Sequence, residues 1–280
     1  MTGHGEPVDP VQPPVRSVLT IAGSDSGGGA GIQADLKTFA ALGLYGTSAI
    51  TAITAQNTVG VSQAMILPAD LITAQIEAVA ADIALHATKI GMLGDAAVVE
   101  SVVAAIEELE LPLVVVDPVM VAKSGDRLVD EDGVRAICEQ LLPLALVVTP
   151  NIPEAEALTG HAIASLDDAR EAAKRIHAMG PSVIIKGGHG SGDDLVDLLY
   201  HDGVFVPFHT PRILTRHTHG TGCTFASAVA AFLALGHGLP EATSRAQAYV
   251  AGAIRHGLAV GHGHGPLDHF WQTRGSILTR

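Results

Sequence analysis

Aromatic and charged residues are scarce in this chain of 280 residues. Phe, Trp and Tyr make up 4% of it, and Asp, Glu, Lys and Arg together 16%, whereas hydrophobic residues reach 48%. The mean hydropathy is +0.35. Such a composition, rich in Ala, Val, Ile, Leu and Gly, is typical of parallel strands that are covered on both faces. It predicts an α/β protein.

Basic residues are also few. The 16 Lys and Arg residues face 29 Asp and Glu residues, which gives a formal net charge of −13. No basic stripe is available to neutralise a phosphate backbone, so the composition argues against nucleic-acid binding. Any phosphate site must therefore be built locally.

Cysteine occurs twice, at Cys138 and Cys223, with no CxxC spacing and no secretory signal. This usage fits a reducing compartment rather than a disulfide framework, and we expect a cytoplasmic location.

Two long stretches, 38–69 and 217–240, carry no Asp, Glu, Lys or Arg, and their length alone would suit membrane spans. Gln56, Asn57 and Pro68 interrupt the first, and Gly, Thr and His dilute the second. We therefore expect a soluble protein with no membrane partner, in which both stretches are buried segments.

Short β-branched runs alternate with helical patterns along most of the chain. The predicted strands cover 18–22, 46–53, 87–90, 113–116, 145–149 and 182–186. The predicted helices cover 31–42, 71–81, 95–109, 131–141 and 168–179, with later ones from 224 and over 240–258. This alternation predicts a mainly parallel central sheet with helices on both faces. Residues 195–200 and 204–207 predict a small antiparallel hairpin at one edge.

The domain organisation follows from composition. Residues 1–16 are rich in Pro and Gly without an apolar period, so we expect a disordered N-terminal tail. No linker, internal repeat or low-complexity tract follows, which predicts one domain over 17–280.

The segment from Thr218 to Cys223 joins a Gly-rich turn to a strongly apolar stretch. With Gly220 and Gly222 the backbone can approach a phosphate closely, and the first N–H groups of the following helix have no partner inside it. A helix N-terminus lowers a thiol pKa, so we expect Cys223 to serve as a base or nucleophile at neutral pH. The alternative is a Gly turn with a small buried cysteine.

Other unusual residues fall at strand ends, where ligands bind in open α/β sheets. The loop Gly23–Gly31 is too irregular for a dinucleotide fingerprint and there is no P-loop, which disfavours a nicotinamide dehydrogenase. Asp35, one turn into the next helix, either reaches a ligand or complements the helix dipole.

Three further strand ends carry polar side chains. The Gln56 amide suits an amino-bearing heteroaromatic ring, or simply satisfies a strand end. Asn151 and Glu154 form either a Mg²⁺ site or a helix capping box. The segment 186–189 suits a nucleotide phosphate, and the loop 123–126 combines charge and flexibility as a lid would.

These segments resemble the hydroxymethylpyrimidine/phosphomethylpyrimidine kinases of thiamine biosynthesis, in the ribokinase-like superfamily. The resemblance runs from about Val18 to Trp271 and is carried by the segments at 22–38, 54–58, 89–93, 117–120, 149–155, 186–189 and 218–224. It implies ATP and Mg²⁺ as cofactors, two successive phosphorylations of the pyrimidine, and a homodimer.

The resemblance also implies roles for single residues. The pyrimidine pocket would contain Gly23, Asp35, Gln56, Met92 and Val119. Asn151 and Glu154 would organise Mg²⁺, directly or through water, while Lys186 and Thr218 would contact the nucleotide. Cys223 would act as the base, and the backbone N–H groups of Gly220, Thr221, Gly222 and Cys223 would stabilise the transferred phosphoryl group. His217 departs from the Asn or Asp that is common at its position in the family.

Two other functions remain open. Pyridoxal also presents a hydroxymethyl group on a heteroaromatic ring, so the chain could be a pyridoxal or pyridoxine kinase. It could also be a catalytically silent, pyrimidine-binding regulatory protein on the kinase fold.

Overall fold

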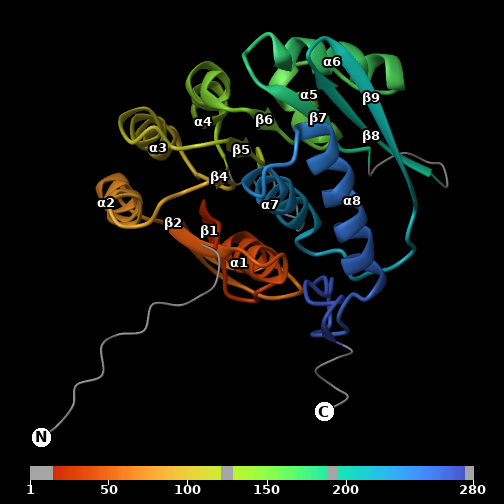
Figure 1. The fold of residues 1–280 in the computed structure, drawn as a ribbon, viewed down its shortest axis with the longest axis horizontal. Coiled ribbons are helices and arrows are strands. Elements are labelled where there is room, and N and C mark those ends of the chain that lie inside the picture. Colours follow the sequence, from red (N-terminus) through yellow and green to blue (C-terminus); the bar gives the residue numbers. More distant parts are fainter. Residues whose placement is uncertain (1–14, 121–128, 188–193, 275–280) are drawn as a thin grey trace, which may run out of the picture.

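The computed structural model describes residues 15–120, 129–187 and 194–274. Their strands form one nine-stranded sheet in the order β3-β2-β1-β4-β5-β6-β7-β8-β9, with helices on both faces (Figure 1). The strands are β1 (Ser17–Asp25), β2 (Tyr45–Gln56), β3 (Val61–Ile66), β4 (Ala87–Ile90), β5 (Val114–Val116), β6 (Val147–Val148), β7 (Ser182–Ile185), β8 (Asp194–His201) and β9 (Val204–Pro211). The α-helices are α1 (Gly31–Ala41), α2 (Ala69–Ala80), α3 (Ala96–Glu108), α4 (Glu131–Ala136), α5 (Ile152–Thr159), α6 (Leu166–His177), α7 (Thr221–Ala234) and α8 (Leu239–Arg255). A π-helix (Ile137–Leu141) and a 3₁₀ helix (Leu142–Leu144) follow α4. The predicted α/β class is confirmed.

The centre of the sheet is parallel and both edges are antiparallel. β2, β1, β4, β5, β6 and β7 pair in parallel, and the predicted hairpin of β8 and β9 closes one edge. At the other edge, β3 pairs antiparallel with β2 and was not predicted. Its residues are mostly exposed, and the sequence VSQAMI does not alternate between apolar and polar residues, so no strand period marks Val61–Ile66. The Asn57 side chain builds the preceding turn by accepting the N–H groups of Val59 and Gly60.

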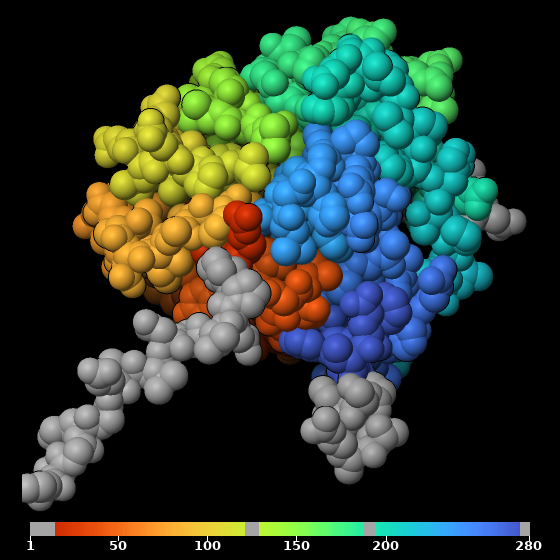
Figure 2. All heavy atoms as spheres, in the orientation of Figure 1, coloured from red at the N-terminus to blue at the C-terminus, as the bar shows by residue number. Residues whose placement is uncertain are grey.

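Alternate residues of the central strands enter two separate hydrophobic cores. In β5, Val114 and Val116 pack against the core under α2 to α6, whereas Val115 packs against the core under α1, α7 and α8. Figure 1 shows these two helical layers on opposite faces of the sheet. In the space-filling view, α1 (orange) and the helices α7 and α8 (blue) form one continuous surface (Figure 2). This double cover explains why the strands are apolar at nearly every position.

The two uncharged stretches are parts of this fold. Most of the first forms β2 and β3, and the second contains α7, which begins at Thr221 rather than at the predicted 224. Among the described residues, no helix has the length and hydropathy that a membrane crossing requires.

Some expectations concern residues outside the described ranges. These are nearly all of the N-terminal tail, the loop 123–126, and residues 188 and 189 of the segment after β7. For these residues the sequence predictions stay as stated.

Candidate active site

A cavity of about 620 Å³ opens at the carboxyl ends of the parallel strands. Its walls come from the ends of β1, β2, β4, β5, β6 and β7 and from the first turn of α7. All the predicted site residues except Asp35 line it: Gly23, Gln56, Met92, Val119, Asn151, Glu154, Lys186, Thr218, Gly220, Thr221, Gly222 and Cys223. The cavity therefore lies at the strand ends, where the sequence predicted a ligand site.

The Gly-rich loop after β1 is organised by Asp25. Its carboxylate accepts the backbone N–H groups of Gly27, Gly29 and Ala30 at 2.8, 3.0 and 2.9 Å. Burial raises the pKa of Asp25, but the hydrogen bonds from His219 and from these N–H groups outweigh burial and hold the pKa below its usual value. The loop is thus wrapped around an ionised carboxylate.

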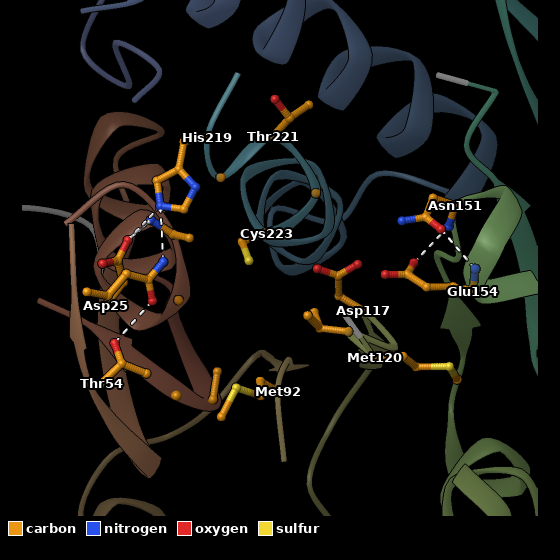
Figure 3. A pocket seen from close by; sticks show the side chains of 18 of the residues that line it. Asp25, Thr54, Met92, Asp117, Met120, Asn151, Glu154, His219, Thr221 and Cys223 are labelled. Carbon is orange, nitrogen blue, oxygen red and sulfur yellow. Dashed lines mark hydrogen bonds and ion pairs between the residues drawn. The ribbon is translucent and has the colours of Figure 1, made fainter. Parts of the chain in front are cut away.

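His219 connects this loop to the turn before α7. Its Nε2 lies 2.9 Å from Oδ2 of Asp25 and 3.4 Å from Nε2 of Gln56, whose Oε1 accepts a hydrogen bond from Thr54. In Figure 3, His219 and Asp25 lie on one side of the cavity, Asn151 and Glu154 on the other, and Cys223 between them. The neighbours of the Gln56 amide are therefore Thr54 of β2 and His219 of the turn before α7.

The turn before α7 requires glycine at Gly220. Its φ is +83°, and a Cβ there would lie 1.8 Å from the carbonyl oxygen of Gly29. The two Gly-rich loops are therefore in direct backbone contact. Gly220 is the N-cap of α7, so the N–H groups of the first turn open into the cavity as an anion site requires.

Cys223 lies in that first turn, but its thiol is not acidic. Burial raises the pKa of Cys223 to about 12, and the positive charge of Lys89 offsets only part of this effect. The expectation of a pKa lowered by the helix N-terminus is therefore wrong. The carboxylates of Asp117 and Asp35 also oppose a negative charge on the sulfur. The free thiol holds its proton at neutral pH.

Asp117 and Lys186 form an ion pair across the ends of β5 and β7. Lys186 Nζ lies 2.9 Å from Asp117 Oδ1, and a Cβ on Gly222 would lie 3.4 Å from that nitrogen. Burial lowers the pKa of Lys186, but Asp117 and Glu154 outweigh burial and raise it above its usual value. Lys186 is therefore a permanent cation beside the start of α7, where a phosphate would need one.

Asn151 and Glu154 form the capping box of α5. Asn151 Oδ1 accepts the N–H of Glu154 at 2.9 Å, and Glu154 Oε2 accepts the N–H of Asn151 at 2.8 Å. The pKa of Glu154 is raised to about 7, because burial and the negative charge of Asp117 together outweigh the positive charge of Lys186. The capping interpretation is thus correct. It leaves the second carboxylate oxygen of Glu154 for a ligand, because the cap uses Oε2 alone.

Asp35 lies behind the cavity wall. It is fully buried, and its carboxylate accepts hydrogen bonds from Thr20, Lys89 and Ser227. The expected contact between Asp35 and the pyrimidine is therefore not supported. The spacing placed Asp35 one turn into α1 correctly, but that face of α1 packs against α7 rather than opening to the cavity.

Four lining residues belong to the segments that carry the family resemblance but had no predicted role: Asp25, Lys89, Asp117 and His219. Each is paired with a residue distant in the chain. A charged residue in or next to a buried strand could have marked these positions as functional. Lys89, for example, is the one charged residue of the apolar strand β4.

Comparison with known proteins agrees with this geometry. The family model for phosphomethylpyrimidine kinase matches residues 25–268. The chain is 48% identical to the hydroxymethylpyrimidine/phosphomethylpyrimidine kinase of Bacillus subtilis, over 95% of this chain and 98% of that protein. It is 52% identical to the thiamine biosynthesis bifunctional protein ThiED of Geobacter sulfurreducens, over 91% of this chain, and the match spans 52% of that longer protein.

Solved structures give the same fold. An ADP complex of Bacillus subtilis pyridoxal kinase superposes with a TM-score of 0.87 at 39% identity, over 93% of this chain and all of that one. Phosphomethylpyrimidine kinase of Clostridium difficile superposes with a TM-score of 0.77 at 44% identity, over 85% of this chain and 99% of that one. The ribokinase-like architecture that the sequence implied is confirmed. With a family model matched over most of its length and relatives near 50% identity, the chain belongs to the phosphomethylpyrimidine kinase family.

Proposed function

We propose that this chain uses ATP to phosphorylate 4-amino-5-hydroxymethyl-2-methylpyrimidine and then phosphorylates the monophosphate to the diphosphate, as a step of thiamine biosynthesis. One observation carries the proposal. The amide of Gln56, the thiol of Cys223 and the N-terminus of α7 face a single cavity in a chain of this family.

The pyrimidine occupies the half of the cavity nearer β1 and β2. The Gln56 amide provides both a donor and an acceptor for the ring nitrogen and amino group. The Met92 methyl group lies 3.4 Å from the position that a Cβ on Gly23 would take, and these two residues with Val119 supply an apolar wall.

Phosphoryl transfer takes place at the start of α7. The hydroxymethyl oxygen attacks the γ-phosphorus as the bond to ADP breaks, and its proton passes to the Cys223 thiolate. N–H groups of residues 220–223 and the ammonium of Lys186 stabilise the charge on the transferred group. Because the free thiol is protonated at neutral pH, Cys223 acts through a minor thiolate population, and positioning supplies most of the rate.

The opposite side of the cavity fits Mg²⁺ together with nucleotide phosphates. Carboxylate oxygens of Glu154 and Asp117 line it, and hard oxygen donors are what this ion prefers. Asn151 holds Glu154 in place through the capping box and would reach the ion through water. Mg²⁺ would neutralise phosphate charge, while Lys186 and Thr218 contact the nucleotide.

A product assay tests the proposal. The chain is incubated with Mg-ATP and either the pyrimidine alcohol or its monophosphate, and mono- and diphosphate are separated and quantified. Diphosphate formed from both substrates supports the full proposal. Binding of pyrimidine and Mg-ATP without any product would instead support a silent regulatory protein.

Pyridoxal phosphorylation is the second candidate. The ADP complex of Bacillus subtilis pyridoxal kinase gives the higher of the two TM-scores quoted above. Identity argues the other way, because the quoted pyrimidine kinases share about half of their residues with this chain. Comparing kcat/KM for pyridoxal and for the pyrimidine decides, and a large preference for pyridoxal would overturn our assignment.

The edge strand β3 supports a homodimer. β3 is an end strand of the sheet, so one of its edges has no neighbouring strand among the described residues. Ile53 of β2 and Met65 of β3 lie opposite each other and are 47% and 60% exposed. Sedimentation of wild type and Met65→Lys tests this surface, with Val204→Lys on β9 as the matched control. Loss of dimer in Met65→Lys alone supports it.

We place the protein in the cytoplasm, where its two free cysteines would stay reduced.

A further inference from the structure

A fully buried lysine lies below the start of α7. Lys89, in the apolar strand β4, has no exposed surface, and its Nζ lies 2.9 Å from Oδ2 of the equally buried Asp35. A Cβ on Gly91 would lie 2.7 Å from that nitrogen, so the turn after β4 has space for the ammonium only because residue 91 is glycine. Isolated buried charges are expensive, so the cost of burying Lys89 and Asp35 is offset by their pairing and by the buried hydroxyl groups around them.

Asp35 ties the pair to the helix that carries Cys223. Its other oxygen, Oδ1, accepts a hydrogen bond of 2.6 Å from Ser227, and Oδ2 accepts one of 2.7 Å from Thr20. Ser227 and Cys223 are four residues apart on α7 and therefore share one face of the helix. The ion pair thus supports the face of α7 that presents the thiol.

The ammonium of Lys89 can donate more hydrogen bonds than Asp35 accepts from it. It carries three N–H donors, and Asp35 is the acceptor found for it in the described part of the chain. Lys89 also lines the cavity, together with Cys223. Its positive charge therefore acts on Asp35 and also on Cys223.

Four charged side chains act electrostatically on the thiol. Lys89 and Lys186 favour a thiolate, whereas Asp35 and Asp117 oppose it. They form two closed ion pairs, Lys89 with Asp35 and Lys186 with Asp117. Because each pair has no net charge, this cluster is neutral while Cys223 is protonated and carries one net negative charge when Cys223 is a thiolate.

We propose that Lys89 is a positioning residue that holds a positive charge beside Cys223 and so stabilises its thiolate, while Asp35 limits that stabilisation. Lys89 keeps its own proton and forms no bond to substrate, and the hydroxymethyl proton goes to the sulfur. The inference rests on the proposed role of Cys223 as the base.

The test measures thiolate directly, without substrate. Iodoacetamide alkylation of Cys223 is followed by mass spectrometry over a neutral to mildly alkaline pH series, in a Cys138→Ala background with Cys223→Ser as the zero-rate control. Since a neighbouring opposite charge shifts a pKa by about one unit or more, Lys89→Met should slow alkylation at each pH roughly tenfold or more. Asp35→Asn should accelerate it.

A purely structural role predicts a different outcome. If the pair only holds the fold, Lys89→Met and Asp35→Asn change the rate in the same direction, or leave it unchanged, and the proposal is overturned. Because Lys89→Met leaves a buried carboxylate unpaired, the neutral variant Lys89→Met/Asp35→Asn carries the test if the single variant does not fold. Its alkylation rate should lie between those of Lys89→Met and wild type, and a rate at or above wild type contradicts the proposal.

Activity then separates this inference from the proposed function. The pH profile of kcat/KM for the pyrimidine should move to higher pH in Lys89→Met and to lower pH in Asp35→Asn. If the wild type phosphorylates no pyrimidine, the proposed function fails, while the alkylation series still decides whether Lys89 controls the thiol.

Discussion

The carboxylate of Asp25 and the imidazole of His219 lie 2.9 Å apart, although 194 residues separate them in the sequence. This contact joins the Gly-rich loop after β1 to the turn before α7. We propose that the first loop belongs to the pyrimidine side of the cavity and the second to the phosphate side, so the contact fixes the two halves of the reaction relative to each other.

His219→Ala should therefore impair catalysis. A hydrogen bond to a charged group contributes about 1.5–3 kcal/mol, so we expect kcat/KM for the pyrimidine to fall roughly tenfold to a hundredfold. Steady-state kinetics measure this, with His209→Ala, at an exposed position on β9, as the control. Equal kinetics for the two variants would show that the contact does not matter for the reaction.

Cys223→Ala should abolish most turnover while leaving pyrimidine binding intact, because a base acts in the transition state. We expect kcat to fall about 10²- to 10⁴-fold. In the wild type, kcat/KM should rise from neutral toward alkaline pH as the thiolate population grows, and the variant should lose this rise.

Calorimetric titration of the pyrimidine and a pH series of kcat/KM measure the two effects. Cys138→Ala serves as the control, because Cys138 packs against the core under α2 to α6. Turnover of Cys223→Ala near the wild-type value would remove the thiol from the mechanism.

Gln56→Leu should mainly weaken substrate binding. Leaving the polar groups of the bound pyrimidine unpaired costs about 1–3 kcal/mol, so the Kd should rise roughly tenfold to a hundredfold. The matched control is Gln272→Leu at an exposed position. An unchanged Kd for Gln56→Leu would count against the amide as the ring contact.

Gly220→Ala should lose both activity and stability. The added methyl group would clash with the Gly29 carbonyl in a left-handed backbone conformation, and the two Gly-rich loops would have to separate. We expect activity to fall at least about a hundredfold, as with loss of oxyanion-type donors.

Gly236 offers a close control for that variant. It also has a positive φ, of +93°, but a Cβ there meets nothing within 4 Å. Gly236→Ala should cost about 1 kcal/mol in the free energy of unfolding and retain activity. Similar activity losses in both variants would mean that backbone strain, rather than contact between the loops, is responsible.

His269 should make the fold sensitive to acid. Burial lowers the pKa of His269 to about 4, and its Nε2 lies 3.0 Å from the Thr224 hydroxyl. Between about pH 6.5 and 4 the unfolded chain binds a proton that the folded chain does not, so stability is lost as the pH falls through this window, by up to about 3 kcal/mol. Denaturant unfolding at several pH values measures the slope. His269→Gln should flatten it, and the exposed-site control His262→Gln should not.

The sequence predicted the architecture and the place of the site for a physical reason. Parallel strands buried on both faces are continuous apolar runs, so a polar residue at their ends, such as Gln56 or Lys186, is conspicuous. β3 was not predicted, because its sequence VSQAMI neither alternates between apolar and polar residues nor forms a continuous apolar run.

The sequence could not show which polar side chains, far apart along the chain, form hydrogen bonds or ion pairs in the fold. Asp35 was assigned to the substrate, but its partners are Lys89 and Ser227, 54 and 192 residues away. The thiol pKa was expected to be low because a helix N-terminus is visible in sequence, whereas burial and the charges of Asp117 and Asp35 are not. Local patterns locate a site, and its electrostatics depend on the packed neighbours.

The alternation of β5 between two cores restricts how this chain can change in length. Val115 faces one helical layer and Val114 and Val116 the other, and Asp117 follows directly. Deleting or inserting a single residue in so short a strand would exchange the two faces and turn Asp117 away from Lys186. Lineages of this enzyme should therefore accumulate length changes in the outer loops, while the spacing within each central strand and its polar end stays constant.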